Sequence, residues 1–168
     1  MEKKTNKTLA IIQARYSSVR LPGKVLKKFK NKTFLEILVK RLKKSKKIST
    51  IVVACSNNKL DKKILDECKK LNISCYRGSE NDVLDRFYKV SKFYNAKNIV
   101  RITADCPLID PEVVDAVIHK YNESEADYGT NTMPATYPDG LDVEIFSFRS
   151  LKESWTKTKG NFFYREHV

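Results

Sequence analysis

Short apolar runs alternate with amphipathic segments along most of this 168-residue chain. The runs predict strands at Leu9–Ile12, Ile51–Ala54, Ile73–Tyr76 and Ile99–Ile102, the first two of them typical of strands buried on both faces of a sheet. Between and after them, apolar residues recur every three or four positions, which predicts helices over 34–42, 60–71, 83–94 and 111–121. Four strand–helix units predict an α/β fold: a Rossmann-like three-layer α/β/α sandwich with a mostly parallel sheet.

The remaining segments complete the predicted domain. Asp110 and Pro111 form a helix start, and Ser79 or Asn81 is expected to cap the preceding helix. Residues 131–139 are irregular, 141–148 alternate as a strand, and 150–158 form a last helix. Without a repeat or linker, residues 1–168 are interpreted as one domain, with 1–7 as a polar, disordered tail.

The positive charge is confined to one part of the chain. The net charge is +13, but residues 1–47 hold 16 basic and 2 acidic residues, so the rest is close to neutral. This excess indicates either an anionic partner or a solvated, lysine-rich helix face. The lysines at 40–47 lack interleaved aromatics, and no nucleic-acid recognition motif is present, which argues against nucleic acid.

Several protein classes are disfavoured by what the sequence lacks. No apolar run approaches the roughly 18 residues of a membrane helix, so no membrane partner is expected. The N-terminus has no signal-peptide centre, which predicts a cytoplasmic protein. The four cysteines form no Cys-x-x-Cys pair, which argues against zinc.

Sheets of this kind bind ligands beyond the carboxyl ends of their strands, which directs attention to the loop at 13–24. Arg15, Arg20 and Lys24 can bind phosphate oxygens, and Gly23 allows the backbone to approach a ligand closely. The glycine patterns of the P-loop and the dinucleotide fold are absent. The alternative is a surface loop with a Pro22–Gly23 turn.

The loop at 103–111 follows the fourth strand and carries Asp105. A carboxylate at this place suits Mg²⁺ held together with substrate phosphates, although it could also cap the loop. Asp110 is interpreted as a helix cap. Basic side chains for a polyphosphate would then face a carboxylate for its metal, which is what phosphoryl or nucleotidyl transfer needs.

These blocks resemble the cytidylyltransferases that activate acidic sugars, such as 3-deoxy-manno-octulosonate and acylneuraminate cytidylyltransferases. The closer match is to the spore coat polysaccharide biosynthesis protein F branch. The resemblance rests on five stretches in order: residues 13–24, 77–86, 101–111, 137–144 and 165–168.

The resemblance implies a fold of the nucleotide-diphospho-sugar transferase type and transfer of CMP from CTP to an acidic sugar or sugar phosphate, with release of pyrophosphate. It implies catalytic roles for Arg15, Lys24 and Asp105, with Asp105 binding Mg²⁺. It places the sugar beside Asp142 and Glu144. The nucleotide-binding residues it implies are Ala14, Arg15, Arg20, Gly23, Lys24, Arg77, Gly78 and Arg86.

One departure from the family pattern concerns the C-terminus. Related enzymes carry a second metal-binding aspartate beyond the position of Val168, so a C-terminal part that completes the site is expected to be missing. The full-length protein is expected to be a homodimer. Three alternatives stay open: use of another nucleoside triphosphate, a non-catalytic nucleotide-binding relic, and a basic nucleic-acid-binding domain.

Overall fold

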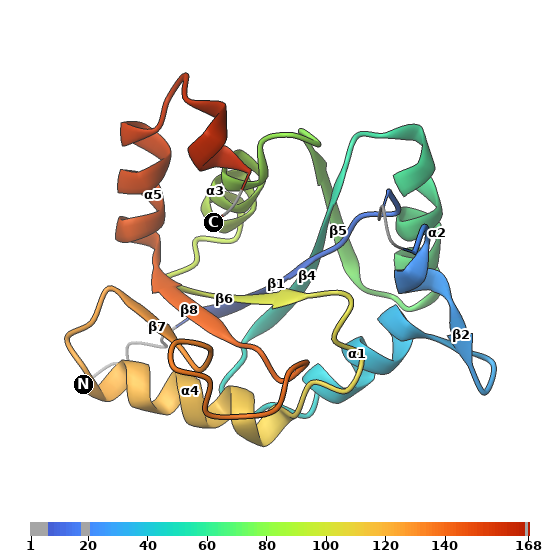
Figure 1. Cartoon of the computed structure of the whole chain (residues 1–168), viewed down its shortest axis with the longest axis horizontal. Helices are drawn as coiled ribbons and strands as arrows, with labels where there is room; N and C mark the ends of the chain where they lie inside the picture. Colours follow the sequence, from blue (N-terminus) through green and yellow to red (C-terminus); the bar gives the residue numbers. More distant parts are fainter. Residues whose placement is uncertain (1–6, 18–20, 167) are drawn as a thin grey trace.

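Six strands form one mixed sheet in the computed structural model, which describes residues 7–17, 21–166 and 168 except the side chain of Phe162. The strand order is β5-β4-β1-β6-β8-β7, with the first four parallel and both β6–β8 and β7–β8 antiparallel (Figure 1). The strands are β1 (Thr8–Gln13), β2 (Lys28–Phe29), β3 (Lys32–Thr33), β4 (Thr50–Ser56), β5 (Ser74–Gly78), β6 (Asn98–Thr103), β7 (Tyr128–Thr130) and β8 (Glu144–Ser147). The helices are α1 (Phe34–Leu42), α2 (Lys62–Lys70), α3 (Val83–Phe93), α4 (Pro111–Glu123) and α5 (Phe148–Lys157), with 3-10 turns η1 (Lys24–Leu26), η2 (Lys59–Asp61) and η3 (Phe162–Arg165).

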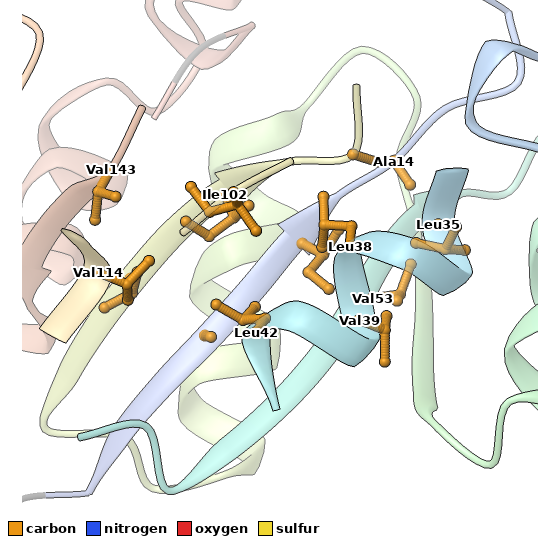
Figure 2. Close-up of a cluster of buried hydrophobic side chains, with 14 of the residues drawn as sticks. Ala14, Leu35, Leu38, Val39, Leu42, Val53, Ile102, Val114 and Val143 are labelled. Carbon is orange, nitrogen blue, oxygen red and sulfur yellow. The ribbon is translucent and has the colours of Figure 1, made fainter. Parts of the chain in front are cut away.

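Helices cover both faces of the sheet, which confirms the predicted three-layer α/β/α arrangement. Figure 1 shows α1 and α4 below the sheet and α3 and α5 above it. Alternate residues of the parallel strands contribute to two separate apolar clusters, one with α1, α2 and α4 and one with α3 and α5. In the first cluster, Leu38 and Leu42 of α1 pack with Val53 and Ile102 of the sheet (Figure 2).

The chain reverses its direction across the sheet at β1. It moves outward from β1 through β4 to β5, and then crosses back to place β6 on the other side of β1. The carboxyl ends of β1 and β6 therefore lie side by side: Gln13 pairs with Thr103, and the Ala104 N–H donates to the Gln13 carbonyl at 3.0 Å. Ligands of doubly wound sheets bind at such a reversal.

Several predicted element boundaries differed from the structure by two or three residues, two of them near the C-terminus. The last predicted strand, 141–148, is ordered as a strand only from Glu144, because the Asn131 side chain bonds the Leu141 carbonyl at 2.8 Å and the Val143 N–H at 2.9 Å. The last helix begins at Phe148, two residues earlier than predicted, because Ser147 caps it.

Helix capping was predicted correctly for α4, where the Asp110 carboxylate accepts from the N–H of Glu112 at 2.8 Å. The cap of α3 is Asp82 rather than the predicted Ser79 or Asn81. A short hairpin of β2 and β3 was not predicted; its turn residue Lys30 has φ 46°.

Most of the predicted N-terminal tail, residues 1–6, lies outside the described residues. Lys7 does contact the fold, since its carbonyl accepts from the Lys97 N–H at 3.1 Å. Among the described residues, no helix has the length and apolar character needed to cross a membrane.

Candidate functional site

A cavity of about 840 Å³ opens at the carboxyl ends of the parallel strands, where the chain reverses across the sheet. This volume lies within the range of small-molecule sites. The lining residues come from the parallel strands and the loops that follow them, the turn η1, the first turn of α3 and the C-terminal segment: Gln13, Arg15, Ser17, Lys24, Val25, Ser56, Glu80, Asn81, Val83, Arg86, Arg101, Thr103, Ala104, Asp105, Phe163 and Glu166.

The loop after β1 brings two of the predicted phosphate-binding side chains, Arg15 and Lys24, into the cavity. Gly23 has φ 68° and donates its N–H to the Tyr16 carbonyl at 2.8 Å; a Cβ there would come within 2.8 Å of the Tyr16 ring. Glycine at this turn therefore places Lys24. Ala14 is buried and bonds the main chain of β4, while the predicted Arg20 lies outside the described residues.

A buried carboxylate that the sequence did not reveal fixes this loop. Asp61 is 1% exposed and accepts hydrogen bonds from the main-chain N–H groups of Tyr16 and Ser56, both at 2.7 Å. It joins the loop after β1 to the end of β4. The loop is thus held by a charge-assisted contact from outside its own sequence.

Lys24 and Asp105, which both line the cavity, form an ion pair. Burial opposes the ionisation of Asp105, but hydrogen bonds from Lys24 and Thr103 outweigh it, so the pKa of the Asp105 carboxyl lies below its ordinary value. The residue predicted to bind phosphate and the residue predicted to bind Mg²⁺ are thus direct neighbours. When a triphosphate binds with its metal, a phosphate could replace Asp105 as the partner of Lys24, and the metal could replace Lys24 as the partner of Asp105.

The donor set predicted for Mg²⁺ consists of one carboxylate, that of Asp105. Asp105 is partly exposed, and no group of three or more His, Cys, Asp or Glu residues arranged for a metal occurs in the described parts of the chain. Mg²⁺ commonly takes one or two protein carboxylates and completes its octahedron with water and substrate phosphates. Asp105, beside the loop that is predicted to bind phosphate, fits such a partial site.

Arg86 extends from the first turn of α3 toward the cavity. It is 2% exposed, and its Nε has no hydrogen-bond partner among the described residues. Its side chain fills the space next to Gly78, where a Cβ would come within 2.5 Å of the Arg86 Cγ. Burial lowers the pKa of Arg86. A buried guanidinium with an unpaired N–H is suited to an acceptor supplied by a ligand.

Arg77, also predicted to bind the nucleotide, has its guanidinium occupied elsewhere. It donates from Nε to the Ser56 carbonyl at 3.0 Å and from a terminal nitrogen to the Asn58 carbonyl at 2.9 Å. These bonds brace the turn between β4 and α2. Arg77 does not line the cavity formed by the described residues.

The two residues predicted to face the sugar have different surroundings. Glu144 pairs with Arg101, which lines the cavity and also donates from Nε to the Gln13 side chain at 3.0 Å. Asp142 lies in the turn before β8. Its pKa is raised by burial and by repulsion from Asp139 and Asp105.

Several cavity residues received no role from sequence reasoning. Glu80 accepts from the Ser17 hydroxyl and the Asn58 amide, both at 2.9 Å, and these bonds lower its pKa. It therefore ties three loops together at the cavity edge. Other residues that line the cavity and were assigned no binding role from the sequence include Gln13, Asn81, Arg101, Thr103, Phe163 and Glu166. Position at the carboxyl end of a predicted strand is a signal that could have identified Gln13 and Thr103.

Comparison with known proteins shows the family of this chain. Residues 9–168 match the profile of the cytidylyltransferase family. This chain belongs to that family. A cytidylyltransferase from Leptospira borgpetersenii serovar Hardjo-bovis has the same fold at a TM-score of 0.89 and 37% identity, over 96% of this chain and 68% of that one. This confirms the resemblance and the fold predicted from sequence.

Two curated relatives cover almost the whole of this cytidylyltransferase-family chain. Uncharacterized protein MJ1063 of Methanocaldococcus jannaschii is 44% identical over 96% of the chain, and spore coat polysaccharide biosynthesis protein SpsF of Bacillus subtilis is 40% identical over 97%. The chain spans 65% and 68% of their respective lengths. CMP:2-keto-3-deoxy-manno-octonic acid synthetase complexed with CTP shares the fold at a TM-score of 0.70 and 15% identity, over 89% of this chain and 78% of that one.

Proposed function

We propose that this chain forms the CTP-binding region of an enzyme that transfers CMP from CTP to an acidic sugar or sugar phosphate, with release of pyrophosphate, for surface polysaccharide biosynthesis. The observation that carries the proposal is the Lys24–Asp105 pair beside Arg15 in the cavity at the ends of β1 and β6. The names of its relatives support it. Besides SpsF, a 3-deoxy-manno-octulosonate cytidylyltransferase of Solibacter usitatus is 33% identical over 67% of this chain and 44% of its own length.

The cavity residues have distinct tasks in this reaction. Arg15 and Lys24 bind the triphosphate, together with the predicted Arg20, and offset its roughly four negative charges. Asp105 holds Mg²⁺, which when bound neutralises phosphate charge. As an acceptor oxygen bonds to the α-phosphorus and the bond to pyrophosphate breaks, Arg15 and Lys24 stabilise the charge that develops on the leaving group.

The nucleoside and the acceptor are assigned to different residues of the proposed site. Arg86, supported by Gly78, offers its unpaired N–H to the nucleoside. Asp142 and Glu144 are assigned to the acceptor. Glu144 pairs with the cavity residue Arg101, and repulsion from Asp105 contributes to the raised pKa of the Asp142 carboxyl. The complete protein is proposed to act in the cytoplasm as a homodimer on small molecules, without nucleic-acid or membrane partners.

Thermal unfolding with CTP, UTP, GTP and ATP, each with and without Mg²⁺, tests the proposal. A ligand at 100 times its Kd stabilises the folded state by about 2.7 kcal/mol, which is readily measured. CTP with Mg²⁺ is expected to give the largest shift. A larger shift with another nucleotide would reassign the substrate. No shift with any nucleotide, together with tight and steeply salt-dependent binding to duplex DNA, would contradict the proposal in favour of a nucleic-acid-binding domain.

A further inference from the structure

The C-terminal segment returns to the cavity after α5 and forms part of its wall. Within this segment, residues 161–166, the side chains of Phe163 and Glu166 line the cavity alongside Glu80, Asn81 and Val83. Figure 1 shows the segment beside α3, on the same face of the sheet. Phe163 is 79% exposed, so its ring is available for contact with a ligand.

Arg165 fastens this segment to the domain. It is 6% exposed, and its Nε donates to Asp82 Oδ2 at 2.7 Å while a terminal nitrogen donates to the Trp155 carbonyl at 3.0 Å. Its guanidinium carbon also lies 5.8 Å from the centre of the Trp155 ring. These contacts account for the side chain without a ligand, so Arg165 acts on the cavity through its neighbours.

Asp82 connects the two walls through its two carboxylate oxygens. Oδ1 accepts the Asp85 N–H at 2.8 Å and caps α3, whose first turn carries Val83 and Arg86 into the cavity, while Oδ2 accepts from Arg165. One carboxylate therefore sets both the start of α3 and the position of the C-terminal segment. The Trp155 Nε1 reinforces the link by donating to Asp85 Oδ1 at 3.0 Å.

The chemistry of the wall indicates which end of a nucleotide it faces. Glu166 is a carboxylate and would repel a polyphosphate, whereas ribose hydroxyls and base amino groups can donate to it. The Phe163 ring offers an apolar face on which a base can stack. The basic side chains for phosphates, Arg15 and Lys24, are supplied by a different loop.

We propose that Arg165 is a positioning residue that holds Phe163 and Glu166 against the nucleoside end of the bound nucleotide. The proposal rests on the proposed function, because it takes the ligand to be a nucleoside triphosphate. It predicts that Arg165 contributes to the affinity for CTP but not to the affinity for pyrophosphate, which has no nucleoside.

Calorimetric titration of the 168-residue chain with CTP and, separately, with pyrophosphate tests this role. Arg165→Met is expected to raise the Kd of CTP about tenfold and to leave the Kd of pyrophosphate within twofold of the wild-type value. Arg165→Lys should recover part of the loss, because an ammonium can still pair with Asp82. Arg149→Met is the matched control: it removes an exposed arginine that pairs with Asp127 at 2.7 Å, and should change neither Kd.

Asp82→Asn separates the two functions of Asp82. Asparagine caps a helix as well as aspartate does, but its amide nitrogen cannot accept from Arg165. Asp82→Asn should therefore weaken CTP binding to about the same extent as Arg165→Met. The double variant should bind CTP only slightly more weakly than either single variant.

The possible outcomes separate this proposal from the proposed function. Wild-type protein that binds neither CTP nor pyrophosphate would remove the proposed function itself. Wild-type binding of CTP with an unchanged Kd in Arg165→Met would overturn only the positioning role. Equal weakening of CTP and pyrophosphate would also overturn it, since the contact would then be a general brace of the fold.

Discussion

The Lys24 ammonium donates a hydrogen bond to the Asp105 carboxylate and joins two loops that are 81 residues apart in the sequence. Both side chains are partly exposed, so the pair itself adds little to stability. The pair matters because of where it lies: in the cavity, each side chain neutralises the other at the position that charged groups of a ligand would occupy.

Lys24→Ala and Arg15→Ala should each weaken triphosphate binding by about 1.5–3 kcal/mol, because each removes a charge-assisted contact to phosphate. Neither side chain belongs to the core, so the midpoint of thermal unfolding without ligand should stay nearly constant. Calorimetry with CTP gives the affinity, and Lys43→Ala, on the exposed end of α1, serves as the control. A large fall in the ligand-free unfolding temperature would show that the loop is structural.

Asp105→Asn should abolish the enhancement of CTP binding by Mg²⁺ while leaving binding without Mg²⁺ unchanged or tighter. The amide is a poor ligand for Mg²⁺, and Lys24 is released to contact phosphate. Titrations with and without the metal provide the comparison. Equal enhancement in variant and wild type would place the metal elsewhere.

The Lys24–Asp105 pair should also respond to pH. The pKa of Asp105 is lowered from 3.8 in the folded protein, so the pair's contribution is complete above that value and is lost as pH falls through the folded pKa. An NMR titration of the Asp105 carboxyl should give a midpoint below 3.8. In Lys24→Ala the midpoint should rise, because burial then acts without its main opposing contact.

Asp61→Ala should destabilise the protein by about 3 kcal/mol, because the buried N–H of Ser56 and the part-buried N–H of Tyr16 lose a charged acceptor. Urea unfolding measures the effect. Asp66→Ala, at a half-exposed position on the following helix α2, should stay within about 0.5 kcal/mol of wild type. A small effect for Asp61→Ala would indicate that water replaces the carboxylate.

Gly78→Ala should destabilise the fold by about 1–3 kcal/mol and weaken nucleotide binding, because the added methyl overlaps the Arg86 Cγ. The same substitution in an Arg86→Ala background should be milder. Unfolding of the single and double variants gives this interaction directly. Identical destabilisation in both backgrounds would trace the strain to other neighbours, such as Tyr76.

Local patterns in the sequence were sufficient for much of the fold. The strands β1, β4, β5 and β6 and the amphipathic helices follow from apolar spacing within a few residues, although β5, at the edge of the sheet, is only partly buried. The start of the predicted strand at 141–148 was wrong because Asn131, ten residues before Leu141, bonds that segment. The hairpin of β2 and β3 has strands of two residues each, too short for any periodicity.

The sequence by itself determined the α/β class, the family and the two loops that carry Arg15, Lys24 and Asp105. Only the tertiary structure decided that Asp61 holds the first loop, that Arg77 braces the main chain outside the cavity, and that Phe163 and Glu166 enter it. The physical reason is the distance along the sequence over which the interactions act. Helix and strand patterns depend on neighbours along the chain, whereas the partner of a charged side chain is set by which distant segments the sheet brings together.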